Sequence, residues 1–250
     1  MLSDWNFYNH SFDELLSELQ DRIIKERKTF LVTANPVIFM EGQRDPHYNE
    51  IVTKADYITP DGIGIVKACH WLKRPVQSRI TGFDLMRQLL ELGNQKGWTI
   101  YLLGAKPEVV SLTNKNIKKM YPNLSITGFH HGYFDDDETI VNEILVTKPD
   151  LIFVAMGCPR QEKWIYDHLP IFQKGVFMGV GGSFNVLAGI EDRAPKQWIH
   201  FHLEWLYRII KKPQRIGLLF ILFLFLFQVS KEYLQLNLVK SHRNVIEKKG

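Results

Sequence analysis

A carboxylate stands in a turn that follows an apolar run, at Asp61 in the segment TPDGIGIV. A turn after a buried strand leaves a side chain partly desolvated and still reachable by a ligand, as a general base must be. Such a base takes the proton from an attacking hydroxyl group. An aspartate before a glycine also caps backbone N–H groups in ordinary turns. The residues alone leave catalysis and turn formation both open for Asp61.

Polar residues and glycines collect where predicted strands end. Ligands of open α/β sheets bind beyond these carboxyl ends, and glycines there let the backbone approach a diphosphate closely. The segment GVGGSFNVLAG, Gly179–Gly189, resembles a phosphate-binding loop, although a tight turn without a ligand gives the same pattern. The candidate residues at strand ends are Thr33, Asn35, Asp61, Gly104, Gly157, Gln161, Gly181 and Gly182.

Other kinds of site receive little support. The chain has neither GxxxxGK[ST] nor a GxGxxG motif in its first strand–helix unit, which disfavours P-loop and dinucleotide-binding proteins. The histidine pairs 130–131 and 200–202 lack carboxylate or cysteine partners at a metal-binding spacing. Aromatic residues between 198 and 207 are typical of a helix face packed on a core, so nucleic-acid binding is disfavoured.

The elements that must position these residues alternate along the chain. Apolar runs such as TFLVTANP, WTIYLLGA and DLIFVAMG are separated by segments of helical periodicity. Ser11 and Glu14 form a potential capping box before the first helix, and Asn35 with Pro36 is able to open another. The pattern predicts an α/β fold with a mainly parallel, Rossmann-like sheet covered by helices on both faces.

Composition places the chain among ordinary globular proteins, with 250 residues, 45% hydrophobic and 23% charged. Its two cysteines follow no disulfide or metal-ligand spacing, which fits a reducing compartment. The start MLSDWNFYNH lacks the basic and apolar regions of a secretory signal. We therefore expect the body of the protein in the cytoplasm.

An apolar run of different character lies near the end, GLLFILFLFLFQV at residues 217–229. As a helix it would extend roughly 20 Å, which is short against about 30 Å of bilayer hydrocarbon. Because basic residues at positions 208, 211, 212 and 215 precede it, attachment to an anionic membrane face is expected. The run is also typical of a helix buried against the body or another copy of the chain, as in a homo-oligomer.

Several motifs, in this order, resemble those of the WecG/TagA/CpsF glycosyltransferase family from about Asp4 to Arg215. They are TANP at 33–36, PDGIGIV at 60–66, RITGFDL at 79–85, LLGA at 102–105, GCPRQEKW at 157–164, GVGGSFNVLAG at 179–189, then RAPKQW and LEWLYRIIKKPQR. Any one motif is only suggestive, whereas the ordered set is specific.

The resemblance implies an enzyme that transfers N-acetylmannosamine or a related sugar, with inversion, from a UDP-sugar donor. The acceptor would be N-acetylglucosamine on undecaprenyl diphosphate, a polyprenyl-diphosphate lipid, in teichoic-acid, capsule or other cell-wall polysaccharide synthesis. The enzyme would be peripheral on the inner face of the cell membrane. It implies a core over residues 1–194 and a membrane-associating helical appendage over 195–250. No metal or other cofactor is expected.

By the same resemblance Asp61 is the general base, and its pocket contains Thr33, Asn35, Arg79 and Gln161. The amide of Gln161 is expected to orient the sugar. Arg208 and Arg215 match positions that bring guanidinium groups over the nucleotide diphosphate and stabilise the departing UDP. Asn185 stands where relatives commonly have an aspartate, so it brings hydrogen bonds without charge to the nucleotide.

Two other functions would fit parts of the same pattern. A catalytically silent, membrane-associated scaffold that binds sugar nucleotides would keep the fold without needing Asp61 beside Arg79 and Gln161. An NAD-dependent sugar oxidoreductase would need a dinucleotide fingerprint near the first strand, and this fingerprint is missing. The motif residues favour the transferase.

Overall fold

The computed structural model describes the backbone of residues 1–247 and the side chains of residues 1–238. Six parallel strands form one sheet in the order β2-β1-β6-β5-β3-β4. Their bounds are β1 Thr29–Ala34, β2 Tyr57–Pro60, β3 Thr99–Gly104, β4 Ser125–His130, β5 Leu151–Ala155 and β6 Val176–Gly179. The predicted parallel α/β sheet is confirmed.

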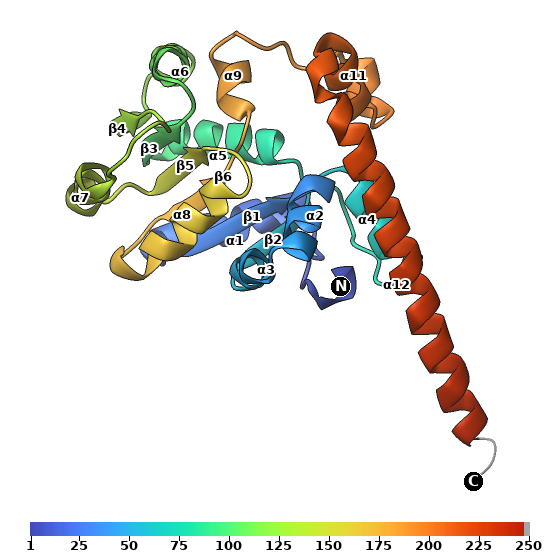
Figure 1. The fold of residues 1–250 in the computed structure, drawn as a ribbon. Helices are drawn as coiled ribbons and strands as arrows, with labels where there is room; N and C mark the ends of the chain where they lie inside the picture. Colours follow the sequence, from blue (N-terminus) through green and yellow to red (C-terminus); the bar gives the residue numbers. More distant parts are fainter. Residues whose placement is uncertain (248–250) are drawn as a thin grey trace.

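Helices cover both faces of the sheet (Figure 1). One face carries α2 Pro36–Arg44, α3 Pro46–Thr53, α4 Ile63–Trp71, α7 Glu138–Thr147 and α8 Arg160–His168. The other carries α1 Phe12–Ile24, α5 Gly82–Lys96, α6 Pro107–Met120 and α9 Ser183–Leu187. Side chains alternate between the faces, since Phe30 and Val32 join one core cluster and Leu31 joins the other. Short 3₁₀ turns span Leu2–Asp4, Leu169–Ile171 and Pro213–Ile216.

Helices α1 and α2 begin at the capping residues predicted from the sequence. The Ser11 hydroxyl accepts a hydrogen bond from the Glu14 N–H, and the Glu14 carboxylate accepts one from the Ser11 N–H. The Asn35 side chain caps α2 by accepting from the N–H groups of Val37 and Ile38, and Pro36 is the first helical residue.

A crevice forms where β1 and β6 lie side by side. The chain leaves β1 toward α2 on one face of the sheet and leaves β6 toward α9 on the other. Loops that diverge from neighbouring strands open a space at the carboxyl edge, which is where α/β proteins bind their ligands. The topology therefore favours a binding site above β1, β2 and β6.

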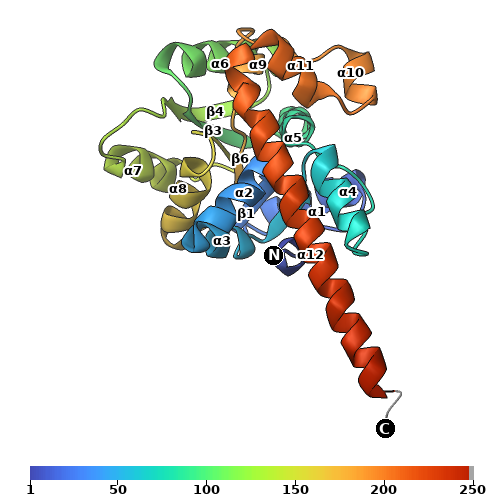
Figure 2. The same cartoon turned by 45° about the vertical axis from the view of Figure 1, so that its right-hand side comes forward.

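The last part of the chain folds back over this edge. It contains α10 Lys196–His200, α11 Glu204–Lys211 and the long helix α12 Gly217–Glu247. Both ribbon views show α12 running down beside α2 and α4 and extending beyond the body (Figures 1 and 2). The helix is longer than the apolar run that predicted it, because neither proline nor glycine interrupts residues 218–247.

One face of α12 is docked on the body. Phe225 and Val229 are fully buried, and the Phe225 ring meets Phe39 of α2 edge-on with centroids 5.5 Å apart. The buried Glu232 carboxylate accepts hydrogen bonds of 2.7 Å from the N–H groups of Leu2 and Ser3. The alternative of a helix packed against the body is therefore correct for this face. The boundary at residue 194 stays a prediction.

Substitution of Gly104 tests how tightly β3 and β5 pack at their carboxyl ends. Its φ is +121°, and a Cβ there would lie 2.5 Å from the carbonyl carbon of Ala155. Gly97 is a matched control, since it also has positive φ, +72°, but a Cβ there would meet no atom within 4 Å. We expect Gly97→Ala to cost about 1 kcal/mol and Gly104→Ala roughly 3 kcal/mol or more.

Thermal unfolding of the two variants measures this difference. For a chain of this size the midpoint should fall by roughly 2–4 °C for Gly97→Ala and roughly 6–12 °C for Gly104→Ala. Equal decreases would contradict the close packing between β3 and β5.

Candidate active site

Asp61 lies at the carboxyl end of β2, at the crevice. Its N–H continues the sheet by donating to the Ala34 carbonyl at 2.8 Å. Its carboxylate accepts a hydrogen bond of 3.1 Å from the N–H of Gly82, the first residue of α5. The free N–H groups and positive dipole end of a helix favour a carboxylate at this position. The local fold thus fixes the orientation of the predicted base.

Thr33 lies beside this helix start. A Cβ on Gly82 would be only 2.8 Å from the Thr33 hydroxyl oxygen, so glycine lets the α5 N-terminus approach β1. Thr33 is buried and pairs in register with Thr59 of β2, two residues before Asp61. The structure therefore brings Thr33 and Asp61 together, as predicted for one pocket.

Electrostatics suit Asp61 to accept a proton near neutral pH. Loss of solvent around the carboxyl raises its pKa from 3.8 to about 6, although the Gly82 N–H and the charges of Arg79 and Arg208 oppose the rise. The Glu204 carboxylate adds to the rise. Asp61 is therefore mostly ionised at pH 7 and more basic than an ordinary aspartate.

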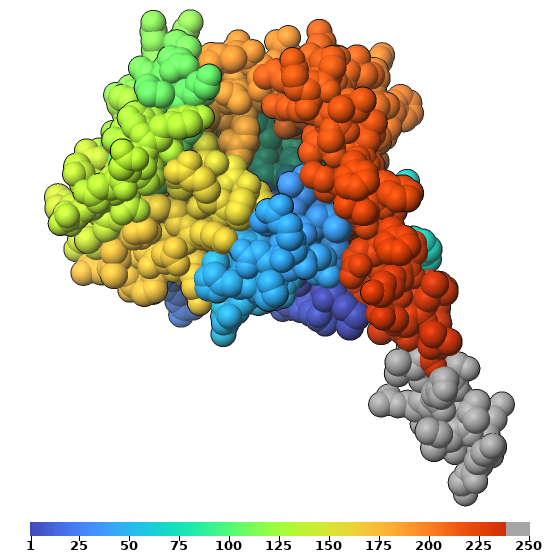
Figure 3. All heavy atoms as spheres, viewed as in Figure 1, coloured from blue at the N-terminus to red at the C-terminus, as the bar shows by residue number. Residues whose placement is uncertain are grey.

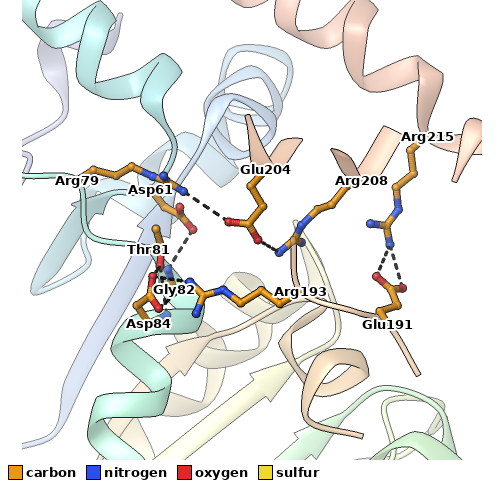
Figure 4. A network of polar contacts seen from close by, with 10 residues as sticks. All are labelled: Asp61, Arg79, Thr81, Gly82, Asp84, Glu191, Arg193, Glu204, Arg208 and Arg215. Atoms are coloured by element: carbon orange, nitrogen blue, oxygen red, sulfur yellow. Dashed lines mark hydrogen bonds and ion pairs between the residues drawn. The ribbon is translucent and has the colours of Figure 1, made fainter. Parts of the chain in front are cut away.

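Arg79 from the core and Arg208 from the C-terminal segment face Asp61 (Figure 4). Glu204 of α11 connects the two, with its carboxylate 2.6 Å from an Arg208 nitrogen and 3.8 Å from an Arg79 nitrogen. Arg79 also lies 3.2 Å from His202 Nδ1. The buried Nε–H of Arg79 has no hydrogen-bond partner among the residues whose side chains the structure describes. Buried polar groups are seldom left unpaired, so this donor is available to a ligand.

A second basic group lies farther along the C-terminal segment. The Glu191 carboxylate accepts from Lys212 at 2.6 Å, from Arg215 at 3.1 Å and from the Asn185 amide at 3.3 Å. Arg193 donates to both carboxylate oxygens of Asp84, at 2.7 and 2.8 Å. These pairs connect α9, α5 and the segment before α12 around the crevice.

Gln161 of α8 ties two loops together. Its amide oxygen accepts from the N–H groups of Gly157 and Gly181, at 3.1 and 3.0 Å, and its amide nitrogen donates to Glu162 at 2.7 Å. Burial raises the pKa of Glu162, whose other oxygen accepts from the Tyr48 hydroxyl at 3.0 Å. Both amide functions therefore serve the protein in this structure, and the sugar-orienting role stays a prediction.

The remaining candidates differ in position. Added Cβ atoms at Gly157 and Gly182 would meet nothing within 4 Å, so open space adjoins these loops. The Asn35 oxygen caps α2 at the end of β1. Gly104 is not brought to Asp61, because β3 lies four strands from β2, about 19 Å at the usual strand spacing. Its packing on Ala155 accounts for a glycine there.

Sequence reasoning missed the acidic partners of the arginines. Glu204 and Asp84 lie within the quoted motifs LEWLYR and RITGFDL, but only the basic residues of the C-terminal motif were assigned roles. Glu191 lies between two motifs and carried no signal. The expectation that no metal takes part stays a prediction.

Figure 3 shows the cleft as a hollow between the α2 region, in blue, and the C-terminal segment, in orange and red. The cleft combines a carboxylate of raised pKa with guanidinium groups able to bind phosphate oxygens. An α/β fold with such groups at the carboxyl edge of its sheet is that of a protein that binds a polar ligand there.

The chain belongs to the glycosyl transferase WecG/TagA/CpsF family, whose pattern matches residues 2–238. It is 37% identical over 215 residues to a protein of Bacillus spizizenii, covering 86% of this chain and 84% of that protein. It is 43% identical over 203 residues to a protein of Staphylococcus aureus strain MW2, covering 81% and 80%. Both relatives are named N-acetylglucosaminyldiphosphoundecaprenol N-acetyl-beta-D-mannosaminyltransferase. The predicted family is confirmed, and the chain is a glycosyltransferase.

The Asp61 carboxylate should lower the free energy of unfolding at pH values where it is charged. A carboxyl whose folded pKa is raised to about 6 destabilises the fold above pH 6, and this penalty fades as pH falls toward its ordinary pKa of 3.8. The full shift corresponds to about 3 kcal/mol, which we reduce to about 1–2 kcal/mol because the residue is partly exposed. Asp61→Asn should therefore stabilise the protein at pH 8.

Thermal unfolding tests whether Asp61→Asn raises or lowers the stability of the protein. We expect a midpoint higher by roughly 2–6 °C at pH 8 and a gain about half as large at pH 5. Asp21→Asn on the exposed side of α1 changes the charge equally and should give no such gain. A lower midpoint for Asp61→Asn at pH 8 would contradict the desolvated carboxylate.

Proposed function

We propose that this glycosyltransferase moves N-acetylmannosamine, or a related sugar, from a UDP donor to undecaprenyl-diphosphate-linked N-acetylglucosamine. The names of the relatives support the transferred sugar and the lipid acceptor. The guanidinium groups around the cleft support a diphosphate-bearing donor. A role in teichoic-acid or other cell-wall polysaccharide synthesis fits such a product.

The proposed reaction is a single displacement. Asp61 takes the proton from an acceptor hydroxyl while that oxygen attacks the anomeric carbon of the donor sugar. The bond between the anomeric carbon and the diphosphate oxygen breaks as the new glycosidic bond forms, and the configuration inverts. Negative charge then grows on the departing UDP, where Arg208 and Arg215 stabilise it. Arg79 is suited to the same charge through its unpaired Nε–H.

The observation that carries this proposal is the position of Asp61. Its carboxylate is fixed by the Gly82 N–H, has a pKa of about 6, and faces Arg79 and Glu204 across the cleft (Figure 4). A protein that only bound sugar nucleotides would gain nothing from a desolvated carboxylate at this point. The combination of base and cationic groups favours the enzyme over a silent scaffold.

The turnover rate and its pH dependence should both be set by Asp61. Purified protein, a short-chain lipid-diphosphate N-acetylglucosamine acceptor and a panel of UDP-sugars should yield a disaccharide product identified by mass. We expect Asp61→Asn to lower turnover by roughly 100- to 10,000-fold, and Asp21→Asn to leave it near wild type. For the wild type, kcat/KM should fall with decreasing pH below about 6, since a protonated Asp61 accepts no proton.

Two outcomes of this assay would count against the proposal. Near-normal turnover of Asp61→Asn would remove the assigned base. Absence of product with every UDP-sugar would remove the proposed donor class.

We further propose that the enzyme is peripheral on the inner face of the cell membrane. The outer stripe of α12, formed by Phe220, Phe223, Phe227 and Leu234, is 61–65% exposed, while Phe225 and Val229 are buried on the body. By length and composition the segment Pro213–Leu238 is able to cross a bilayer. Because its other face is docked through Phe225 and Glu232, we propose that α12 lies along the membrane surface.

Substitutions on the outer stripe test this orientation without removing the docked face. The triple variant Phe220→Ser, Phe223→Ser, Phe227→Ser should lose most co-sedimentation with vesicles containing phosphatidylglycerol, while its thermal midpoint stays near wild type. A matched triple variant, Ile24→Ser, Val146→Ser, Ile171→Ser, removes exposed apolar side chains from the body and should still co-sediment. Equal binding by the two variants would exclude α12 as the attachment site.

A further inference from the structure

Glu191 occupies a point where donors from three directions meet. Lys212 Nζ lies 2.6 Å from its Oε1, Arg215 Nη2 lies 3.1 and 3.3 Å from its two oxygens, and the Asn185 amide lies 3.3 Å away. The Glu191 side chain is only 13% exposed (Figure 4 shows its pair with Arg215). Its surroundings are those of a bound anion.

The charge of Glu191 is maintained by these neighbours. Burial raises the pKa of the carboxyl, but the hydrogen bond from Lys212 and the charges of Arg215, Lys212 and Arg208 outweigh burial and hold the pKa below its usual value. An ionised carboxylate offers a guanidinium group two oxygens, as a phosphate does. The N–H groups of Lys212 and Arg215 that donate to Glu191 would therefore also donate to a phosphate in its place.

Two of the residues that surround Glu191 are expected to contact the donor nucleotide. Under the proposed function Arg215 stabilises the diphosphate, and the family resemblance implies that Asn185 contacts the nucleotide. In the structure Arg215 and Lys212 are paired with a side chain of the protein itself. A phosphate bound by the same N–H groups would have to displace the carboxylate or share them with it.

We infer that Glu191 is an internal counter-anion that competes with the donor's diphosphate for Arg215 and Lys212 and so lowers the affinity for the nucleotide. This inference rests on the proposed function, since it takes UDP as the ligand of the cleft. Its ligand class is a nucleoside diphosphate, recognised here through the diphosphate part.

Two other roles for Glu191 lead to different results. A carboxylate that accepts hydrogen bonds from the ribose hydroxyls would favour nucleoside binding, so its loss would weaken both uridine and UDP. A carboxylate that only braces the C-terminal segment would help every ligand of the cleft. Of these three roles, only competition predicts stronger diphosphate binding when the negative charge is removed.

Glu191→Gln separates these roles, because the amide keeps an oxygen for Lys212 or Arg215 and loses the charge. Calorimetric titrations of the full chain with UDP, pyrophosphate and uridine at one ionic strength should show UDP and pyrophosphate binding roughly three- to tenfold tighter than to wild type. Uridine affinity should stay within about twofold, which also shows that the cleft is folded. Asp21→Asn, with the same change in net charge, should bind all three as wild type does.

The outcomes distinguish this inference from the proposed function. If wild type binds UDP and Glu191→Gln binds it equally or more weakly, the competition is overturned while the proposed donor stands. A parallel loss of uridine and UDP binding in Glu191→Gln overturns it in favour of ribose binding or bracing. Failure of UDP to bind the wild-type protein overturns the proposed donor and, with it, this inference.

Discussion

The hydrogen bond from the Gly82 N–H to the Asp61 carboxylate is the contact on which the site depends. It requires the first turn of α5 to lie against the ends of β1 and β2, which glycine permits because any side chain would collide with Thr33. The bond compensates part of the cost of desolvating a carboxylate. The resulting group is aimed into the crevice, ionised at neutral pH and more basic than in water. A surface aspartate would have only the charge.

The site is composite, since the core supplies the proposed base and the C-terminal segment supplies much of the positive charge. Glu204 connects the two parts by pairing with Arg208 of its own helix and Arg79 of the core. The same segment leads directly into α12, which is docked on the N-terminal residues through Glu232. The proposed membrane contact of α12 and the positive charge over the cleft would thus be properties of one continuous stretch of chain. A lipid-linked acceptor held at the membrane would approach the cleft from the side on which this stretch lies.

The sequence predicted the elements better than their contacts. Strands such as β1, β3 and β5 were recognisable because parallel strands buried on both faces are continuous apolar runs. Asp61 was recognisable as a carboxylate in a turn after a run of this kind. Strand order was not predictable, since an apolar run carries no information about its neighbours. The partner of Arg215 was missed because Glu191 reaches it only after the chain folds back. Glu204 and Arg208, by contrast, are four residues apart on one helix, so this pair could have been predicted from the sequence. The two faces of α12 were equally hidden, because residues 217–227 are apolar all round and only the packing on Phe39 distinguishes Phe225 from Phe223.

In the proposed reaction Asp61 takes the acceptor's proton within reach of the donor. A crystal structure of the protein with UDP and a short-chain lipid-diphosphate N-acetylglucosamine measures this directly, as the distance from the Asp61 carboxylate to the nearest acceptor hydroxyl oxygen. We predict a hydrogen bond of about 2.6–3.2 Å, with the UDP diphosphate on the same side of the cleft as Arg208 and Arg215. An acceptor whose hydroxyl groups all lie beyond the reach of Asp61, with another side chain in its place, would contradict the account.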